Sequence, residues 1–478
     1  MPAIVTNKFR LNNAEQFYES FSEASTSFYL FVGRPQPWTI TTPYGGGTDS
    51  APPTPLDNVD DEFMYFRDMQ AAKRITSTDI QYAIPRHNWT SGTVYDYYRG
   101  DYGAQWSSTT TDIVKTVNDG TNLWASTTLF YVLSSLNHVY KCMWNDGATA
   151  STVEPTGTSN AELTTGDDYV WKYMYTLTTA QVADFLTADF MPVATNATVS
   201  SAAVDGAIRH CKVERVGAGY TPASGTTAYT AVPINGDGAS GVATVTVTDG
   251  AVASVTITTP GTGYTFATID VDAISGIGTP STSAIVTPII GPKGGHGYNA
   301  VNELGGFYVM SNTSIASTEG GGDFVVDQDF RRVGIVLNPY NYGTTTISTA
   351  STLSGLKSMT FAASPTPGTF VHDEIITGGT SDAKGKVVHW DSTNRVLKYI
   401  QTQWTGVETA VGADKNKLTA FAVSEVVTGS PSTSTGTIAS LTNPEIDYYS
   451  GNIIYAEDRS PITRATDQTE NVKLIVEF

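Results

Sequence analysis

Two short patterns that each occur twice constrain the fold of this chain most strongly. The pattern Gly-x-Gly-Tyr-Thr occurs at residues 217–221 and again at residues 261–265. A second set of five residues recurs at a constant offset of 51, so that Phe370 corresponds to Phe421. The other pairs at this offset are Glu374 and Glu425, Thr377 and Thr428, Gly378 and Gly429, and Gly385 and Gly436. Since repeats of this length are typical of duplicated supersecondary units, we expect two modules built from similar parts.

Strand and turn patterns dominate both modules. Residues 242–248 and 252–258 flank Asp249-Gly250, which predicts a hairpin with a two-residue turn. Charged residues make up only 15% of the chain, and Ser, Thr and Gly take their place. Soluble domains usually carry about a quarter of charged residues. A chain of 478 residues is long enough for several domains, so the sequence predicts a folded, mainly β, multi-domain protein.

Three helices are expected beside the strands. The first is predicted at residues 13–23, with Asn12 or Asn13 as its cap and apolar residues at helical spacing. The second is predicted at residues 59–70, after Asp57 or Asn58, with acidic residues in its first turn. The third is predicted at residues 179–186, where Thr178 and Gln181 have the spacing of a capping box.

The C-terminal segment predicts a strand that runs to the last residue. Val472, Leu474, Val476 and Phe478 fall on one face of an extended chain, which is the period of two that a half-buried strand shows. A chain that ends on an apolar aromatic residue should have its terminus tied into a sheet.

Several classes of function are disfavoured by composition. The net charge of −19 leaves no basic stripe for nucleic acid. Cys142 and Cys211 form no disulfide framework. The chain has neither a signal-peptide pattern nor an apolar run of about 18 residues, so we expect no membrane span.

Motifs for catalysis or cofactor binding are missing. The glycine-rich segment 291–298 lacks the Lys-Ser/Thr ending of a phosphate-binding loop, and we expect it to form a tight chain reversal. The six histidines show no zinc-binding spacing, and no Gly-x-Ser-x-Gly marks a nucleophilic serine. We therefore predict no enzyme activity, no cofactor, no metal and no small-molecule substrate.

Six blocks of sequence, taken in order, carry a family resemblance. The N-terminal blocks are Ala-Ile-Val-Thr-Asn-Lys-Phe-Arg at residues 3–10, Gly33-Arg34 with Pro37-Trp38, Ala-Ile-Pro-Arg at 83–86 with Trp89, and residues 166–173; the later ones are 331–339 and 451–478. Together they resemble the baseplate wedge protein of T-even-type contractile-tailed phages, the gene product eight family. The first block is similar to that family's opening strand.

The resemblance implies how the chain is divided. It covers roughly residues 1–190, 325–340 and 445–478, and it lapses where the two repeats lie. We therefore expect an α+β core built from both chain ends, with inserted antiparallel β-sandwich or barrel modules. The expected parts are the N-terminal core at residues 1–195, an inserted β-domain at 196–290, a return to the core at 291–344, an inserted β-module at 345–440, and the C-terminal part of the core at 441–478.

The resemblance also implies function and partners. It predicts a structural component of the virion, made in the host bacterial cytoplasm and placed in the tail baseplate. It implies a homodimer that contacts the wedge proteins corresponding to gene products seven, ten, six and fifty-three. Candidate interface residues are those of the matched blocks that lie beside loop signals: Pro37, Trp38, Pro85, Arg86, Trp89, Arg459, Asp467 and Gln468.

Two other functions remain open from the sequence. Repeated β-modules rich in Tyr and Trp would also suit a receptor-binding or glycan-binding tail adhesin. A tail depolymerase would need two acids across a sugar cleft, and the available carboxylate pairs are Asp167 with Asp168, Asp270 with Asp272, and Asp327 with Asp329.

Overall fold

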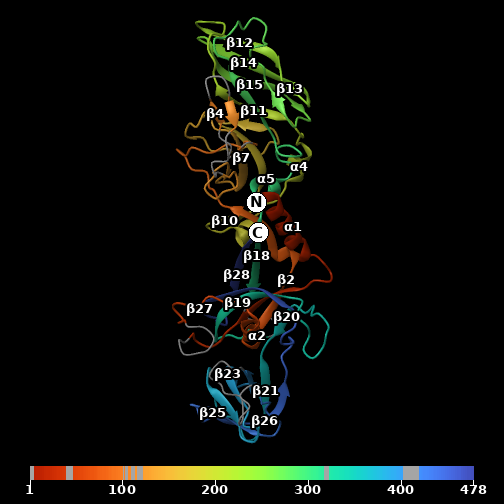
Figure 1. The fold of residues 1–478 in the computed structure, drawn as a ribbon. Helices are drawn as coiled ribbons and strands as arrows, with labels where there is room; N and C mark the ends of the chain where they lie inside the picture. The colour runs from red at the N-terminus through yellow and green to blue at the C-terminus, as the bar shows by residue number, and fades with distance from the viewer. Residues whose placement is uncertain are drawn as a thin grey trace. The chain divides into compact units, whose positions relative to one another are not determined.

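The fold is mainly β and multi-domain, as predicted (Figure 1). The computed structural model describes residues 5–38, 47–100, 102, 106–108, 113–115, 122–316, 322–401 and 419–478.

The chain divides into two compact units. Unit 1 comprises Met1–Glu15, Gln81–Met310 and Ile475–Phe478, and unit 2 comprises Gln16–Ile80 and Ser311–Leu474. Each unit therefore contains residues from both the beginning and the end of the chain. The chain passes between the units within one helix and three strands, namely α1 (Asn7–Ser20), β3 (Ile80–Pro85), β18 (Tyr308–Ile315) and β28 (Glu470–Glu477).

Unit 1 contains a four-stranded sheet with an aromatic core. Its order is β6 (Tyr131–Leu133), β7 (His138–Trp144), β9 (Val170–Thr176) and β8 (Glu162–Thr164). The central strands bury Tyr140, Cys142 and Trp171 completely. Five consecutive residues of each central strand are buried, so both faces of these strands are covered.

The first repeat lies in a second part of unit 1. Here β12 (Thr226–Pro233), β14 (Ala239–Thr248) and β15 (Ala251–Thr262) form an antiparallel sheet. Asp249 and Gly250 join β14 to β15 with φ values of 50° and 82°, so the predicted hairpin is confirmed. Beside this sheet, β11 (Ile208–Arg215) pairs with β17 (Ile285–Ile290), and β13 (Asn235–Gly236) pairs with β16 (Ala267–Thr268).

The tyrosines of the Gly-x-Gly-Tyr-Thr repeat anchor this region. Tyr220 and Tyr264 are 1% and 3% exposed and belong to the same apolar cluster. The Tyr264 hydroxyl donates to the Ile234 carbonyl at 3.1 Å, and the Tyr220 hydroxyl donates to Asp272 Oδ1 at 2.6 Å. The glycines that precede each tyrosine have positive φ, which lets the backbone bend beneath the ring.

Unit 2 is built on a five-stranded sheet. Its order is β20 (Thr352–Ser354), β2 (Met69–Ile75), β1 (Phe28–Gly33), β19 (Asp329–Leu337) and β27 (Asn452–Thr463). Segments from the beginning, middle and end of the chain thus lie side by side. The central strand β1 is buried along its whole length, and Tyr65 and Phe66 of α2 (Val59–Arg67) pack against its Tyr29 and Phe31.

The three predicted helices differ in how well their ends were placed. Helix α1 begins at Asn7, not at residue 13, because Thr6 Oγ1 accepts the Phe9 N–H at 3.3 Å and takes the capping role expected of Asn12 or Asn13. The opening strand expected at residues 3–10 is wrong from Asn7 onward, because Asn7 begins α1.

Helix α2 starts as predicted, with Asn58 Oδ1 accepting the Asp61 N–H at 3.0 Å. It ends at Arg67 and not at residue 70, because the chain enters β2 at Met69. Helix α3 (Thr179–Phe185) has the predicted capping box of Thr178 and Gln181 and is confirmed to within one residue. Two short helices, α4 (Ala197–Ser201) and α5 (Ala300–Leu304), were not predicted.

The C-terminal strand is confirmed as far as Glu477, although the predicted alternation of burial holds only through Leu474, since Ile475, Val476 and Phe478 are all half-buried. In β28, Val472 and Leu474 are 7% and 5% exposed, while the intervening Lys473 is only half-buried. The strand belongs to a sheet of order β10 (Phe190–Pro192), β3, β18 and β28. The Phe478 N–H donates to the Phe307 carbonyl at 3.1 Å, which ties the last residue to the fold.

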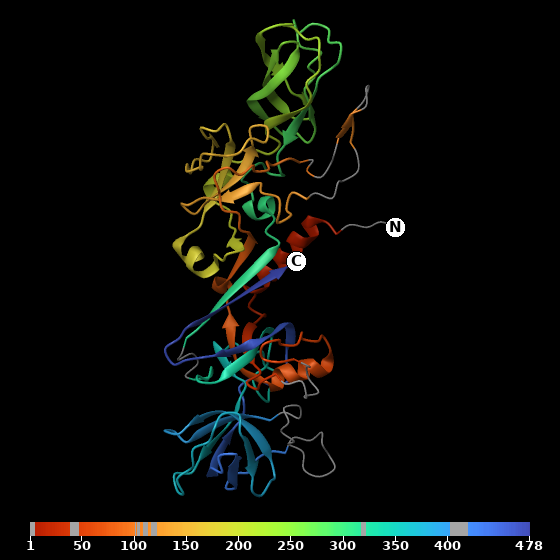
Figure 2. The same ribbon diagram turned by 90° about the vertical axis from the view of Figure 1, so that its left-hand side faces the viewer.

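The second repeat forms a closed six-stranded barrel in unit 2, drawn in blue in Figure 2. The order around the barrel is β21 (Lys357–Phe361), β24 (Val396–Ile400), β23 (Lys384–Asp391), β22 (Ile375–Gly378), β25 (Val426–Ser430) and β26 (Thr435–Thr442). Strands β22 and β25 pair antiparallel, with Thr377 opposite Thr428. These two residues are 51 positions apart, so a local twofold axis passes through their pair.

Two buried glutamates link the halves of the barrel. Glu374 Oε2 accepts the Ser432 N–H of the second half at 3.1 Å, and Glu425 Oε2 accepts the Ser381 N–H of the first half at 2.9 Å. Each carboxylate also covers a glycine of the other half: a Cβ at Gly429 would lie 2.7 Å from Glu374 Oε1, and one at Gly378 would lie 2.6 Å from Glu425 Oε2. The repeated Glu and Gly therefore serve one reciprocal contact.

Candidate functional site

The Pro37-Trp38 segment and β27 meet in unit 2. Trp38 is 4% exposed, and its indole N–H donates to the Arg459 carbonyl at 3.1 Å. Its backbone N–H donates to Asp49 Oδ1 at 2.8 Å. Pro37 is exposed, and its carbonyl accepts from Arg34 Nη2 at 3.4 Å. Two of the predicted interface positions, Trp38 and Arg459, are thus in direct contact.

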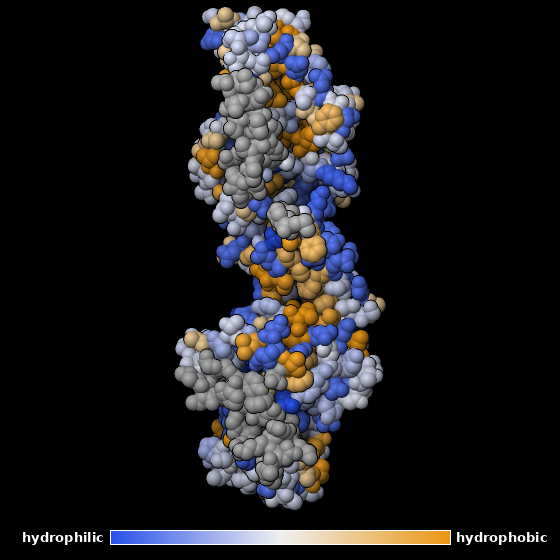
Figure 3. Space-filling view, in the orientation of Figure 1, coloured by the Kyte–Doolittle hydropathy of each residue, from blue (hydrophilic) through white to orange (hydrophobic). Residues whose placement is uncertain are grey.

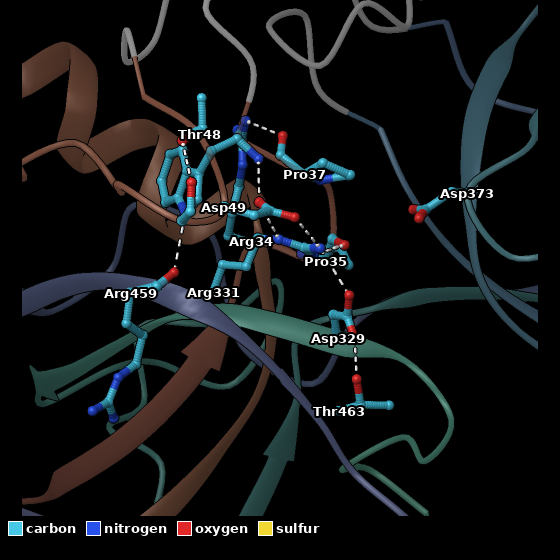
Figure 4. A network of polar contacts seen from close by, with 12 residues as sticks. Arg34, Pro35, Pro37, Thr48, Asp49, Asp329, Arg331, Asp373, Arg459 and Thr463 are labelled. Atoms are coloured by element: carbon cyan, nitrogen blue, oxygen red, sulfur yellow. Dashed lines mark hydrogen bonds and ion pairs between the residues drawn. The ribbon is translucent and has the colours of Figure 1, made fainter.

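Arg331 organises the polar contacts around this segment (Figure 4). Its Nε and Nη2 donate to the two carboxylate oxygens of Asp49 at 2.9 and 3.0 Å. Nη2 also donates to Asp329 at 2.7 Å, and Nη1 donates to the Pro35 carbonyl at 2.7 Å. The hydrogen bonds from Arg331 hold the pKa of Asp49 below its ordinary value.

A second set of charges is buried next to the first. Arg332 Nε and Nη2 donate to the two oxygens of Asp458 at 2.6 and 3.2 Å. Asp68 Oδ2 lies 3.5 Å from Arg34 Nη1 and 3.7 Å from Arg332 Nη1. The four side chains are between 1% and 7% exposed. Two arginines and two aspartates therefore balance one another out of contact with bulk water.

Aromatic rings surround the two buried arginines. The Arg34 guanidinium lies 4.6 Å from the centroid of the Trp38 ring. The Arg332 guanidinium lies 4.2 Å from the Tyr65 ring and 5.5 Å from the Trp38 ring. Such contacts stabilise a desolvated cation by about 2 kcal/mol or less. The Trp38 ring therefore stabilises the buried guanidinium groups as well as packing against its neighbours.

Burial shifts the pKa values of this set. Burial lowers the pKa of Arg34, while the neighbouring Asp68 carboxylate opposes that change. Burial likewise raises the pKa of Asp458, and the Arg332 guanidinium opposes the rise.

Three polar atoms of the second set have no hydrogen-bond partner among the described residues. They are Arg34 Nε, Arg332 Nη1 and Asp68 Oδ1. A buried donor or acceptor without a partner costs about 1–3 kcal/mol, more for a charged group. The second set is therefore incomplete within the described part of the chain.

A pocket of about 230 Å³ is lined in part by the residues of the second set. Its polar lining is Arg34, Asp61, Asp68, Arg332 and Asp458, and Trp38, Tyr65, Met64, Pro53, Pro55, Leu56 and Thr54 complete the wall. Thr54 and Leu56 are exposed, which places them at the entrance. The pocket is therefore a candidate binding site in unit 2.

The predicted positions Pro85, Arg86 and Trp89 belong to unit 1. The Pro85 carbonyl accepts the Tyr131 hydroxyl at 2.9 Å, and Arg86 Nη1 donates to the Thr187 carbonyl at 2.7 Å. The Trp89 indole N–H donates to Ser151 Oγ at 3.2 Å. All three are half-buried, so part of each side chain reaches the surface.

The remaining predicted positions lie on β27 and in the turn after it. The Arg459 side chain lies 3.7 Å from Glu457 Oε1 and is 36% exposed. Asp467 and Gln468 are exposed, and Gln468 Oε1 accepts the Ala465 N–H at 3.2 Å.

Sequence reasoning missed Arg331, Arg332, Asp68 and Asp458 as site residues. A signal for the first two was present: Arg331-Arg332 interrupts the otherwise apolar strand at residues 330–337. Charged residues in a strand that is buried on both faces must find partners, because an unpaired buried charge is too costly to retain.

Unit 1 holds a smaller buried ion pair at the glycine-rich loop. Lys141 is fully buried, and its ammonium group donates to Glu303 Oε2 and to His296 Nδ1, the latter at 2.8 Å. Glu303 Oε1 accepts the Gly297 N–H at 2.8 Å. Burial lowers the pKa of His296 well below its ordinary value, and Lys141 adds to this effect. Gly294, Gly295 and Gly297 all have positive φ, which confirms the tight chain reversal.

At least one carboxylate of each pair considered for glycan cleavage has structural partners. Asp167 Oδ2 accepts N–H groups of Thr152 and Val153 at 2.7 and 3.0 Å, and its pKa is lowered to about 2 by hydrogen bonds that outweigh the effect of burial. Asp272 accepts the hydroxyls of Tyr220 and Ser283. Across the described ranges, no group of three or more His, Cys, Asp or Glu is placed to hold a metal ion, and no helix there is long and apolar enough to span a membrane.

Comparison with known proteins places the N-terminal region. A family model described as bacteriophage T4 Gp8 matches residues 3–205. Over these residues the chain is similar to the Gp8 family. No curated protein matches the chain. The Gp8 match confirms the family predicted from the sequence and supports a structural role in a phage baseplate.

The Gp8 match includes Pro37, Trp38, Pro85, Arg86 and Trp89. It also includes Arg34 and Asp68, and therefore half of the buried charges around the pocket. The other half, Arg332 and Asp458, lies beyond the matched region.

Proposed function

We propose that this protein is a non-enzymatic component of the baseplate wedge of a contractile phage tail. The match of residues 3–205 to the Gp8 family carries the proposal. The protein would assemble through protein–protein interfaces with the wedge proteins corresponding to gene products seven, ten, six and fifty-three, and it would form a homodimer.

Surface composition supports a role in assembly. Figure 3 shows apolar residues gathered in several patches among hydrophilic ones on the face in view. Large apolar side chains that are at least 40% exposed include Phe9, Phe63, Phe266 and Val59. Exposed apolar patches on soluble proteins commonly mark interaction sites.

The predicted interface positions would divide into two roles. Pro37, Asp467 and Gln468 are exposed and could contact a neighbour directly, whereas Trp38 is buried and would position the segment that carries Pro37. The half-buried Pro85, Arg86, Trp89 and Arg459 would contribute the parts of their side chains that reach solvent.

We also propose that residues 196–290 and 345–440 are insertions in a core built from residues 1–195, 291–344 and 441–478. The closed barrel at 357–442 supports this, because a barrel has no open edge and can fold around its own core. Replacing residues 357–442 with a short flexible linker should leave a folded remainder that keeps β20. Loss of cooperative unfolding in that variant would contradict the proposal.

Solution mass tests the function most directly. The purified protein should have the mass of a dimer, and it should form a larger complex with at least one wedge protein encoded by the same phage. Each candidate wedge protein is mixed separately and analysed by light scattering after size-exclusion chromatography. A monomer that binds none of them would overturn the proposed function.

A further inference from the structure

Helix α2 carries exposed apolar side chains on the face that does not pack against the sheet. Val59 and Phe63 are 63% and 40% exposed, and they lie one helical turn apart on the same face of the helix. The Tyr449 ring, which is 43% exposed, packs edge-to-face against Phe63 at a centroid distance of 4.5 Å. We call these three residues the α2 surface. Contiguous exposed apolar side chains mark interaction sites, whereas isolated ones are normal on soluble proteins.

Tyr449 has a backbone conformation that is costly for a tyrosine. Its φ is 66°, in the left-handed region that glycine and asparagine adopt most easily. The strained backbone places the ring between the exposed Phe63 and the buried Phe66, whose ring centroid lies 6.2 Å away. Backbone strain of this kind gathers at functional sites, because stability alone would favour a residue without the strain. The conformation of Tyr449 therefore indicates, independently of exposure, that its ring is used at the surface.

We propose that the α2 surface docks a segment of a neighbouring baseplate protein that is both apolar and basic. An aromatic or aliphatic side chain of that segment lies against Phe63 and Tyr449, and a lysine or arginine lies near Asp57 and Glu62. The proposal rests on the proposed function for the presence of a neighbour, and on this chain's own residues for the chemistry of the segment.

Acidic residues at the start of α2 determine the charge of the segment. Asp57 is exposed, and Asp61 and Glu62 are half-buried. Glu62 follows Val59 by three residues, so the two side chains are neighbours on the helix surface. Charges of opposite sign across an interface speed association and exclude wrong partners. A lysine or arginine next to the apolar contact is therefore the complement of this border.

Arg67 lies at the other end of the same helix face and is already engaged. It follows Phe63 by four residues, its Nε donates to the Tyr449 hydroxyl, and its guanidinium lies 5.4 Å from the Tyr449 ring. Arg67 therefore holds the ring in place and spends its charge within the surface. The same face of a second copy would bring more acidic groups and no uncommitted cation from this helix, so charge favours a different, basic partner.

The buried face of α2 keeps the surface in place before a partner binds. Met64, Tyr65 and Phe66 are 2%, 5% and 1% exposed, and Asn58 caps the helix by accepting the Asp61 N–H at 3.0 Å. A preformed surface avoids much of the entropic cost of ordering side chains upon binding. Aromatic residues are also enriched in the centres of protein–protein interfaces.

Variants of the full-length protein test the apolar contact. Phe63→Ala removes a ring from the α2 surface, and Phe266→Ala is the matched control, because Phe266 is 60% exposed and belongs to unit 1. Each variant is titrated with a wedge protein of the same phage that binds the unaltered chain, and calorimetry gives the dissociation constant. We expect Phe63→Ala to weaken binding by at least about tenfold, as at an interface hot spot, and Phe266→Ala by less than about twofold.

Tyr449→Asn separates binding from stability. Asparagine tolerates the left-handed conformation, so the variant relieves the strain while it removes the ring. We expect the melting temperature to change by less than about 3 °C and binding to weaken by at least about tenfold. Unchanged binding by folded Phe63→Ala and Tyr449→Asn proteins would overturn the inference and leave the proposed function standing. If no wedge protein binds the unaltered chain, the proposed function and the inference fall together.

Salt and charge variants test the basic character of the segment. We expect binding of the unaltered chain to weaken by at least about fivefold between about 0.1 and 0.5 M NaCl, because salt screens exposed charges. The double variant Asp57→Asn with Glu62→Gln should lose most of this salt dependence. Asp184→Asn with Asp189→Asn neutralises two exposed carboxylates of unit 1 and should keep it. Full salt dependence in the first double variant would overturn the assignment of a basic partner.

Solution mass distinguishes a basic neighbour from a second copy of this chain. Light scattering gives the mass of the unaltered protein and of Phe63→Ala without any partner present. We expect the same mass for both, since the α2 surface contacts a different protein. If Phe63→Ala converts a dimer into a monomer and still binds the wedge protein normally, a second copy covers the α2 surface and the inference is wrong.

Discussion

Arg331 and Arg332 are consecutive residues with similar burial, but their hydrogen-bond partners differ. Arg331 makes hydrogen bonds to Asp49, Asp329 and Pro35, all between 2.7 and 3.0 Å. Arg332 makes two close hydrogen bonds to Asp458, and its Nη1 has only a looser ion pair with Asp68 at 3.7 Å. A complete set of partners makes Arg331 a fixed structural element. The set around Arg332 is incomplete and leaves Nη1 buried without a hydrogen-bond partner among the described residues.

A local irregularity separates the two environments. Phe330 is opposite Ile462 and Arg332 is opposite Asp458, so the ladder between β19 and β27 shifts register at this point. Register shifts of this kind re-aim neighbouring side chains and are frequent next to functional sites. The comparison shows that two arginines with similar burial can differ in how completely their hydrogen bonds are satisfied.

The largest expected effect is that of Arg332→Leu. This change leaves Asp458, which is 2% exposed, as a buried carboxylate without its main partner. We expect unfolding free energy to fall by about 3–5 kcal/mol, as is usual when one member of a buried pair is removed. Chemical denaturation of the full-length protein measures the loss. The double variant Arg332→Leu with Asp458→Leu should recover much of it, and no recovery would show that the loss came from the cavity and not from the stranded charge.

Arg331→Leu should cost less although it removes more hydrogen bonds. Its partners Asp49 and Asp329 have side chains that are 35% and 29% exposed, so water can replace the guanidinium. We expect a loss of about 2–3 kcal/mol, mainly from hydrogen bonds between charged groups. The same denaturation experiment ranks the two variants. A larger loss for Arg331→Leu than for Arg332→Leu would contradict the argument that partner exposure sets the cost.

Sequence patterns predicted local elements of the fold but not the long-range contacts of Arg332. The β-rich composition, the Asp249-Gly250 hairpin, the Thr178–Gln181 capping box and the C-terminal strand depend on neighbouring residues, and all four are confirmed. The pairing of Arg332 with Asp458 joins residues 126 positions apart. No local propensity encodes such a contact, because it exists only once β19 and β27 lie side by side.

The start of α1 shows a second limit of prediction from the sequence. Both Thr6 and the asparagines at 12 and 13 are good helix caps, and local patterns do not decide between them. The observed start at Asn7 adds residues to the helix, among them Arg10, whose guanidinium lies 3.7 Å from the Phe307 ring. A long-range contact thus accompanies the earlier start, and sequence alone does not reveal it.

Lowering the pH should change the contributions of Asp49 and Asp458 to folding stability in opposite directions. The folded-state pKa of Asp49 is lowered, chiefly by hydrogen bonds from Arg331, so its contribution to stability is present above the unfolded pKa and is lost as pH falls through the folded pKa. The folded-state pKa of Asp458 is raised by burial, so its contribution is present below the unfolded pKa and is lost as pH rises through the folded pKa.

The measurement is the melting temperature between neutral pH and about pH 3, below the ordinary pKa of aspartate. Asp49→Asn should lose less stability on acidification than the unaltered protein, whereas Asp458→Asn should lose more. If Asp49→Asn keeps the full acid sensitivity, the ion pair with Arg331 does not contribute to it.

The smallest expected effect on stability is that of Thr54→Val. Thr54 is exposed at the pocket entrance, and no charged group of the network depends on it. Surface changes of this kind usually alter the unfolding free energy by less than about 0.5 kcal/mol. Chemical denaturation should therefore give the same midpoint for this variant and the unaltered protein. A clear loss would mean that the entrance is coupled to the charges below it, and that Arg332 is part of a closed structural network in the way that Arg331 is.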